Sequence, residues 1–401
     1  MAKDSRGQNK GFSPARTVWR TQMTKGVYTP HRVSRITCIV NEHLTEKLSV
    51  FLNNLGITIY MENGRIVRQI IKSRPYGLPG EISDLRDFPV DVFRFTVPRE
   101  NSKDIINHII NITDLHIPGR GTVFSQDLIE FSYDPPDLNL EALTAIKSKD
   151  YSEMLLHKLS CVVCVLSEPG SGEIMAKHAL ELGVCVPLVT FGRGNDIRDQ
   201  LGLIRITIPA EKEIVHLVMP ELDSESIIRI LIELCRLDKP GRGFIYQTPV
   251  SLGLPDTFLK IGKQKYAASI EQIIAAIDQL KSGTGWRRRL DAEHQKKRAW
   301  KLLLPNENCE ISIISDEDRT DKLRETCLQI GAREAVTTRI IPLKGKDENP
   351  ITSTITRSAI SIPANISDRV VNSLLENNII KEDSPDRIQV LDSPAAYMHT
   401  I

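Results

Sequence analysis

Two short phrases of this chain combine glycine with arginine in a way that suits anion binding. Both read PGRG, and they occupy residues 118–121 and 240–243. Glycine lets bare backbone approach a ligand, and consecutive amides can form a nest that binds an anion. The guanidinium adds a planar fork suited to phosphate or carboxylate. The phrases therefore predict sites for a small anion, although a glycine turn between a helix and a strand can also serve chain geometry alone.

The turns recur because the chain repeats itself. Three phrases share one pattern: VPRENSKDII (97–106), MPELDSESII (219–228) and IPANISDRVV (362–371). Each begins with an apolar residue and a proline, has a serine four positions after the proline, and continues with apolar residues at helical spacing. Proline cannot donate to a ladder, so each proline is expected to end a strand, and each serine is expected to be the N-cap of the next helix. The prolines are Pro98, Pro220 and Pro363, and the serines are Ser102, Ser224 and Ser367.

Upstream of each phrase, a strand candidate precedes a helix-like stretch. The strand candidates cover residues 35–40, 159–166 and 309–314. Each helix-like stretch is expected to end at a glycine in the left-handed conformation, and these glycines are Gly56, Gly183 and Gly331. Each unit therefore reads β-α-β-β-α-β, which is the ferredoxin-like pattern. In units one and two the glycine turn would join the second helix to the last strand. We expect an α+β protein of three tandem units packed as a pseudo-trimer.

The units set the expected domain limits. These are a basic N-terminal arm (1–34), unit one (35–140), unit two (158–258), a helical insertion (262–306) and a divergent unit three (307–401). The insertion predicts an amphipathic helix over 267–283 and a basic helix over 284–304. The basic helix could dock an anionic partner, or it could be a solvated face that bridges two units.

Composition excludes several function classes. The 401 residues carry a formal net charge of +1, so no global field favours nucleic acid, and no apolar run is long enough for a membrane span. No secretory signal is visible, and an odd count of seven cysteines argues against a disulfide framework. Cys161 and Cys164 form the only CxxC, and on a strand they should face opposite sides as core residues. The histidines are scattered, and no Walker, GxSxG or HExxH motif occurs, so we expect no enzyme and no metal site.

Unit two resembles the PII (nitrogen regulatory protein P-II) signal-transduction superfamily, and units one and three do so more weakly. The similarity lies in the GV that enters the second strand, FGRG (191–194), EKEIVHLVMP (211–220), ESIIRILIE (225–233) and the glycine turn before FIYQTPV (244–250). The resemblance implies trimers of this unit that bind adenine nucleotides or related effectors between subunits, while a long loop engages or releases a target. Three units in one chain would build that trimer within one molecule.

Transferred to this sequence, the resemblance implies an effector site and a regulated partner. The partner would be a target protein such as a membrane transporter or a metabolic enzyme, and the location would be cytoplasmic, or peripheral at the membrane through that partner. No cofactor is expected besides an ATP-, ADP- or AMP-type ligand. The expected effector-binding residues are Gly119, Arg120, Gly121, Gly192, Arg193, Gly194, Lys239, Gly241, Arg242 and Gly243.

Departures from the family pattern widen the range of ligands that we expect. Better-known members place an acidic residue inside the turn and a lysine after it, whereas this chain has Arg242 and Phe244, and unit three has SPDRIQ without glycine. We therefore expect at most two competent clefts that bind an adenine nucleotide or another small anion. A β-branched residue at Gly243 is expected to abolish binding and to leave the fold largely intact. An amino-acid-sensing module of the ACT type and an assembly scaffold with empty clefts remain as alternatives.

Overall fold

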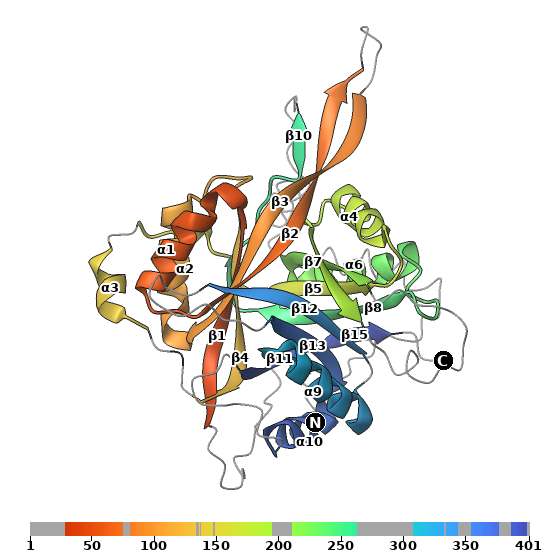
Figure 1. Ribbon diagram of the computed structural model, residues 1–401. Coiled ribbons are helices and arrows are strands. Elements are labelled where there is room, and N and C mark those ends of the chain that lie inside the picture. The colour runs from red at the N-terminus through yellow and green to blue at the C-terminus, as the bar shows by residue number, and fades with distance from the viewer. Residues whose placement is uncertain are drawn as a thin grey trace, which may run out of the picture.

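The protein is of the mixed α+β class, as predicted, and its described residues form a 15-stranded sheet that is mostly antiparallel (Figure 1). Seven α-helices occur among the described residues. The computed structural model describes residues 29–74, 81–133, 136, 138–146, 149–194, 211–262, 308–332, 334–343, 354–376 and 386–398.

The first segment, residues 29–132, places its strands in the order β2-β3-β1-β4. Strands β2 and β3 form a long hairpin that projects beyond the rest of the molecule (Figure 1). The elements of this segment are β1 (Thr29–Asn41), η1 (Glu42–Leu44), α1 (Thr45–Asn54), β2 (Ile59–Ser73), β3 (Glu81–Pro98), η3 (Arg99–Asn101), α2 (Ser102–Thr113) and β4 (Gly121–Ser132).

The second segment, residues 159–250, has the strand order β6-β7-β5-β8. Its elements are β5 (Leu159–Leu166), α4 (Ser171–Glu181), β6 (Leu188–Gly194), β7 (Glu211–Pro220), α6 (Glu221–Leu234) and β8 (Gly243–Val250). The third segment, residues 308–393, has the order β12-β13-β11-β14. Its elements are β11 (Asn308–Asp316), α9 (Glu317–Ile330), β12 (Glu334–Leu343), β13 (Ile355–Pro363), α10 (Ala364–Glu376) and β14 (Arg387–Ser393).

Short elements outside the three segments connect them. After β8 the chain returns to the first segment, where β9 pairs with β4 and β10 pairs with β2. After β14 it crosses to the second segment, where β15 pairs with β8. These elements are α3 (Leu140–Ala145), η4 (Ser152–Met154), β9 (Leu252–Leu254), β10 (Lys260–Gly262) and β15 (Ala395–Met398).

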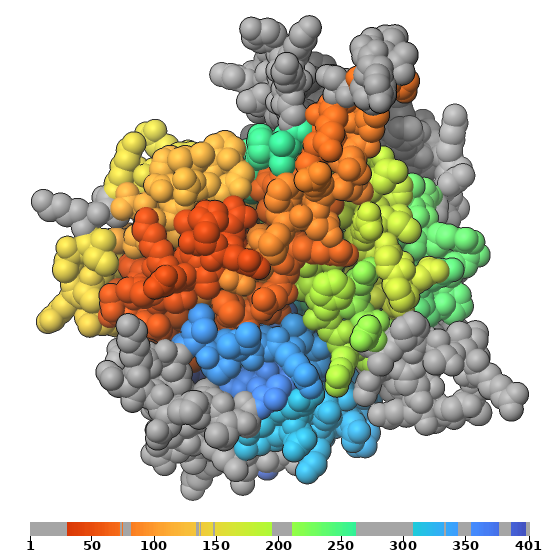
Figure 2. Space-filling model, turned by 45° about the horizontal axis from the view of Figure 1, so that its top comes forward, coloured from red at the N-terminus to blue at the C-terminus, as the bar shows by residue number. Residues whose placement is uncertain are grey.

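The three segments meet around a common centre. Strands β2, β6 and β12 pair with one another in all three combinations. Strand β4 pairs with β14, and β8 contacts both of them. The helix pairs α1/α2, α4/α6 and α9/α10 lie outside the strands at three corners (Figure 1), and Figure 2 shows each segment in its own sector of one face.

Apolar packing follows the same arrangement. Each helix pair covers a core of its own segment, whose fully buried members include Ile106, Leu231 and Ile311. A further core is shared, because it joins Val92 of the first segment to Val163 of the second and to residues of the third. Burial of this shared apolar surface favours association of the segments.

The predicted strands and the glycines expected after the first helices are confirmed, but the capping serines are wrong. The three predicted strands lie within β1, β5 and β11, and the helix-ending glycines Gly56, Gly183 and Gly331 have positive φ values of 73°, 68° and 118°. Helix α6 begins directly after Pro220, so Ser224 lies inside its first turns and donates to the Glu221 carbonyl at 2.6 Å. Ser367 donates likewise to Ala364, and Ser102 begins α2 after Asn101.

The predicted arm is too long at its C-terminal end. Strand β1 begins at Thr29 and pairs with β4 from that residue onward, so residues 29–34 belong to the sheet. The rest of the arm and both helices predicted within the insertion lie outside the described residues. No helix in the described ranges combines the length and apolarity needed to cross a bilayer.

Candidate functional site

The first glycine turn connects α2 to β4, as predicted. Gly119 and Gly121 have φ values of 93° and 149°, in the region that favours glycine. Gly121 also begins β4 beside β1, and a Cβ there would lie 2.0 Å from the Ile39 carbonyl oxygen. Glycine at 121 is therefore required by the close approach of two strands.

This first turn holds a carboxylate that belongs to the chain itself. The Gly119 amide donates to Asp256 Oδ1 at 3.0 Å, and the Phe258 amide donates to the same oxygen at 2.9 Å. Arg68 Nη2 lies 2.5 Å from Asp256 Oδ2, and both side chains are at most 3% exposed. The Phe258 ring packs between Gly119 and Arg68, whose guanidinium lies 5.5 Å from the ring centroid. The turn is thus an anion site whose occupant is Asp256.

The second turn, between α6 and β8, has the same backbone form. Gly241 and Gly243 have φ values of 73° and 134°. The Arg242 amide donates to Lys239 at 3.4 Å, as the Arg120 amide donates to Ile117 at 3.3 Å in the first turn. Within the described part of the chain, however, the Gly241 amide has no hydrogen-bond acceptor, whereas its counterpart Gly119 binds Asp256. The second turn therefore presents a free donor where the first holds a carboxylate.

Basic groups surround the second turn. Arg242 forms an ion pair with Glu168, and its carbonyl accepts from the Ser167 amide at 3.0 Å. The Ser167 hydroxyl in turn accepts from Lys212 Nζ at 3.0 Å, and Lys212 is buried on β7. Lys239 is exposed. Three cations and one carboxylate give the site a net positive charge, which favours an anionic ligand.

The expectation that a β-branched residue at Gly243 would leave the fold intact is wrong. A Cβ on Gly243 would lie 2.0 Å from the Val165 carbonyl oxygen, because β8 begins there against β5. A β-branched residue at this position would force two paired strands apart. It would therefore damage the fold as well as the turn.

Gly192, Arg193 and Gly194 lie in strand β6, whereas the sequence predicted the start of a surface loop there. Strands β5 and β7 separate β6 from β8, but the Lys212 side chain reaches across this distance. A Cβ on Gly192 would lie 2.8 Å from Val336 Cγ2 on β12, whereas a Cβ on Gly194 would meet the Lys212 side chain. Gly192 therefore lies at the junction of the second and third segments, and Gly194 adjoins the lysine that donates to Ser167 beside the turn.

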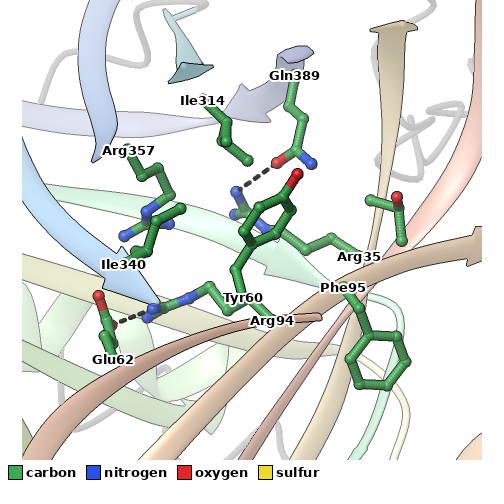
Figure 3. Close-up of a pocket in the computed structure, with 10 residues that line it drawn as sticks. Arg35, Tyr60, Glu62, Arg94, Phe95, Ile314, Ile340, Arg357 and Gln389 are labelled. Carbon is green, nitrogen blue, oxygen red and sulfur yellow. Dashed lines mark hydrogen bonds and ion pairs between the residues drawn. The ribbon is translucent and has the colours of Figure 1, made fainter. Parts of the chain in front are cut away.

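Sequence reasoning missed a cavity of about 20 Å³ between the first and third segments. Three arginines line this cavity, Arg35 on β1, Arg94 on β3 and Arg357 on β13, but these strands contain several other polar residues, so no distinct pattern marks the arginines. Figure 3 shows their guanidinium groups turned toward the shared space. The cavity is lined by Arg35, Tyr60, Glu62, Arg94, Phe95, Thr96, Ile314, Ile340, Arg357 and Gln389.

The CxxC cysteines are core residues, as predicted. Cys161 packs in the shared core and Cys164 in the core of the second segment, on opposite faces of β5. Burial raises the pKa of Cys161 to about 12, and it also raises the pKa of Cys164. Among the described residues, no group of three or more His, Cys, Asp or Glu side chains could hold a metal ion.

Comparison with known proteins adds no identity. Neither a family model nor a curated protein matches the chain. Among solved structures, aspartate kinase from Synechocystis aligns at 9% identity with a TM-score of 0.16, over 92% of this chain and 52% of that chain. The chain thus spans about half the length of that kinase, and a TM-score this low carries no argument about fold or function.

Proposed function

We propose that the chain consists of three tandem ferredoxin-like units packed as an intramolecular pseudo-trimer, and that it is a PII-like regulator of a partner protein. The same strand order in all three segments, 2-3-1-4 within each set of four, supports the units. The mutual pairing of β2, β6 and β12 supports the pseudo-trimer. A small anionic effector, most simply an adenine nucleotide, would bind at the second turn.

The carboxylate of Asp256 at the first turn is the observation that carries this proposal. A turn of this backbone form binds an anion there through the Gly119 amide. The second turn repeats the form, leaves the Gly241 amide free among the described residues, and adds Arg242 and the nearby Lys212. A phosphate or carboxylate would accept from these donors in charge-assisted hydrogen bonds.

Regulation would come from a preference of the effector for one arrangement of the chain. A ligand shifts an equilibrium only by its differential affinity for the two states. Arg242 would exchange Glu168 for the effector, and Lys212, which donates to Ser167 beside the turn, couples the turn to β7. No catalytic step is part of this function.

One observation favours a second candidate. The anion at the first turn is a carboxylate rather than a phosphate. An amino acid would offer the same group to the second turn, as in sensing modules of the ACT type. The two candidates share a site and differ in the ligand.

Calorimetry on the full chain tests both candidates. We expect saturable binding of ATP, ADP, AMP or a cyclic nucleotide for the first and of an amino acid for the second. Arg242→Ala should weaken that binding about tenfold or more, because it removes a charged donor. Arg120→Ala is the matched control and should leave affinity unchanged, because Asp256 already fills the first turn. Equal losses in both variants, or no binding by any of these ligands, would refute the proposal.

A further inference from the structure

The cavity between the first and third segments contains more positive charge than its own carboxylates balance. Arg94 forms an ion pair with Glu62, and Arg35 lies 3.0 Å from Glu310. Arg357 is 8% exposed, and within the described ranges it forms neither a side-chain hydrogen bond nor an ion pair.

The buried carboxylate of Glu130 accepts from Gln389 at 2.9 Å and has Arg387 4.0 Å away, so four guanidinium groups lie around three carboxylates. A buried charge without a partner is costly, so an occupant with one negative charge would be favoured.

Neighbouring groups respond to this excess of positive charge. Burial lowers the pKa of His216 well below its usual value, and Arg94, Arg357 and Arg35 lower it further. Burial also lowers the pKa of Arg94. Glu62 raises this pKa, and Arg357 lowers it further. Burial alone would raise the pKa of Glu310, yet Arg35 and Arg357 bring it down to about 2. All three groups thus lie in one positive potential.

Two donors near the cavity have no acceptor among the described residues, and Glu62 Oε2, which also lines the cavity, has no donor. The Nε atoms of Arg35 and Arg357 are buried without a hydrogen-bond partner among the described residues. Both side chains line the cavity, one from β1 and the other from β13 (Figure 3). Buried donors are normally satisfied by protein or by an occupant, so these two mark the place where one is missing.

We propose that this cavity binds one small monovalent inorganic anion, of the size of chloride or bromide, between Arg357 and the guanidinium groups of the first segment. A cavity of about 20 Å³ holds one or two water-sized species and excludes a nucleotide. The anion balances the remaining guanidinium and accepts from donors of two segments. It therefore joins the first segment to the third, and this role does not depend on any effector at the glycine turns.

Thermal unfolding of the full chain in halide tests the proposal. The titration uses sodium chloride or bromide against sodium gluconate at constant ionic strength, because gluconate is too large for the cavity. At halide concentrations above the dissociation constant, we expect the Tm to rise with the logarithm of the halide concentration, by about 1–2 °C for each tenfold increase, and to stay constant in gluconate. Identical curves in halide and gluconate would overturn the proposal and leave water as the occupant.

Two variants assign the effect to the cavity. Arg357→Met removes the unbalanced charge and should abolish the halide-dependent shift. Arg339→Met, an exposed arginine of the same segment with 64% of its side chain accessible, should retain the full shift. A halide shift that persists in Arg357→Met would place the anion elsewhere and refute the site.

Crystals soaked in bromide supply a readout that does not depend on the folding of any variant. An anomalous peak beside Arg357 in the wild-type protein is the expected result. Its absence at a bromide concentration that raises the Tm in solution would refute the cavity as the site.

Discussion

Removing the carboxylate of Asp256 provides the most direct measurement of what a glycine turn can bind. Asp256→Ala leaves Arg68 without its ion-pair partner at a position where both side chains are almost fully buried. It also removes the acceptor of the Gly119 and Phe258 amides. Breaking a buried pair from one side costs about 3–5 kcal/mol, so we expect a loss of that size in the free energy of unfolding.

The variant also creates a vacancy of known shape. Alanine lacks only the carboxylate group of aspartate, so formate added to the solution can fill the place that the side chain occupied. We expect formate to restore part of the lost stability of Asp256→Ala, with a gain that grows with the logarithm of the formate concentration, and neutral formamide to restore much less. Chemical denaturation with and without formate measures both effects.

A matched control lies on the β2–β3 hairpin. Asp87 forms an ion pair with Arg65 at 2.6 Å, but its side chain is 41% exposed. Asp87→Ala should cost about 0–1 kcal/mol and should show no formate rescue. If Asp256→Ala were no less stable than Asp87→Ala, or if formate stabilised the wild-type protein equally, the first turn would not be an anion site.

The remaining predictions concern pH and backbone geometry. The pKa of Glu310 is about 2 in the folded protein against 4.5 ordinarily, so its stabilisation of roughly 3 kcal/mol is complete above pH 4.5 and is lost as the pH falls toward 2. Denaturant unfolding between pH 6 and pH 3 should show this loss, and Glu310→Gln should flatten it; an unchanged slope in the variant would contradict the assignment. Gly243→Val should prevent stable folding because of the 2.0 Å approach to Val165, whereas Gly56→Ala, with open space around the Cβ, should cost only about 1–2 kcal/mol for its positive φ. Similar yields and Tm values for the two glycine variants would refute that distinction.

Local patterns predicted most of the elements. Residues such as Pro220 and Gly331 end a strand and a helix for reasons that lie within a few positions of the chain. The same local reasoning failed for Ser224, because the helix begins directly after the proline and leaves the serine inside it. Pro220 therefore decides where helix α6 begins, whereas the sequence pattern predicted that Ser224 would do so.

Contacts between distant residues could not be predicted in this way. Arg35 and Glu310 are 275 positions apart, and each lies in a strand with several other polar residues, so neither stands out along the chain. Asp256 lies in a connecting stretch with no motif, and only the fold brings it to Gly119, 137 positions away. The occupied turn and the charged cavity therefore became visible only once the segments were placed together.

The pairing of β15 with β8 has a consequence for synthesis of the chain. Strand β8 leaves the ribosome well before β15, so one of its edges stays uncovered while the whole third segment is translated. An open strand edge is a template for pairing with other nascent chains. Folding of the nascent chain therefore passes through a stage in which this edge of β8 is open to such pairing.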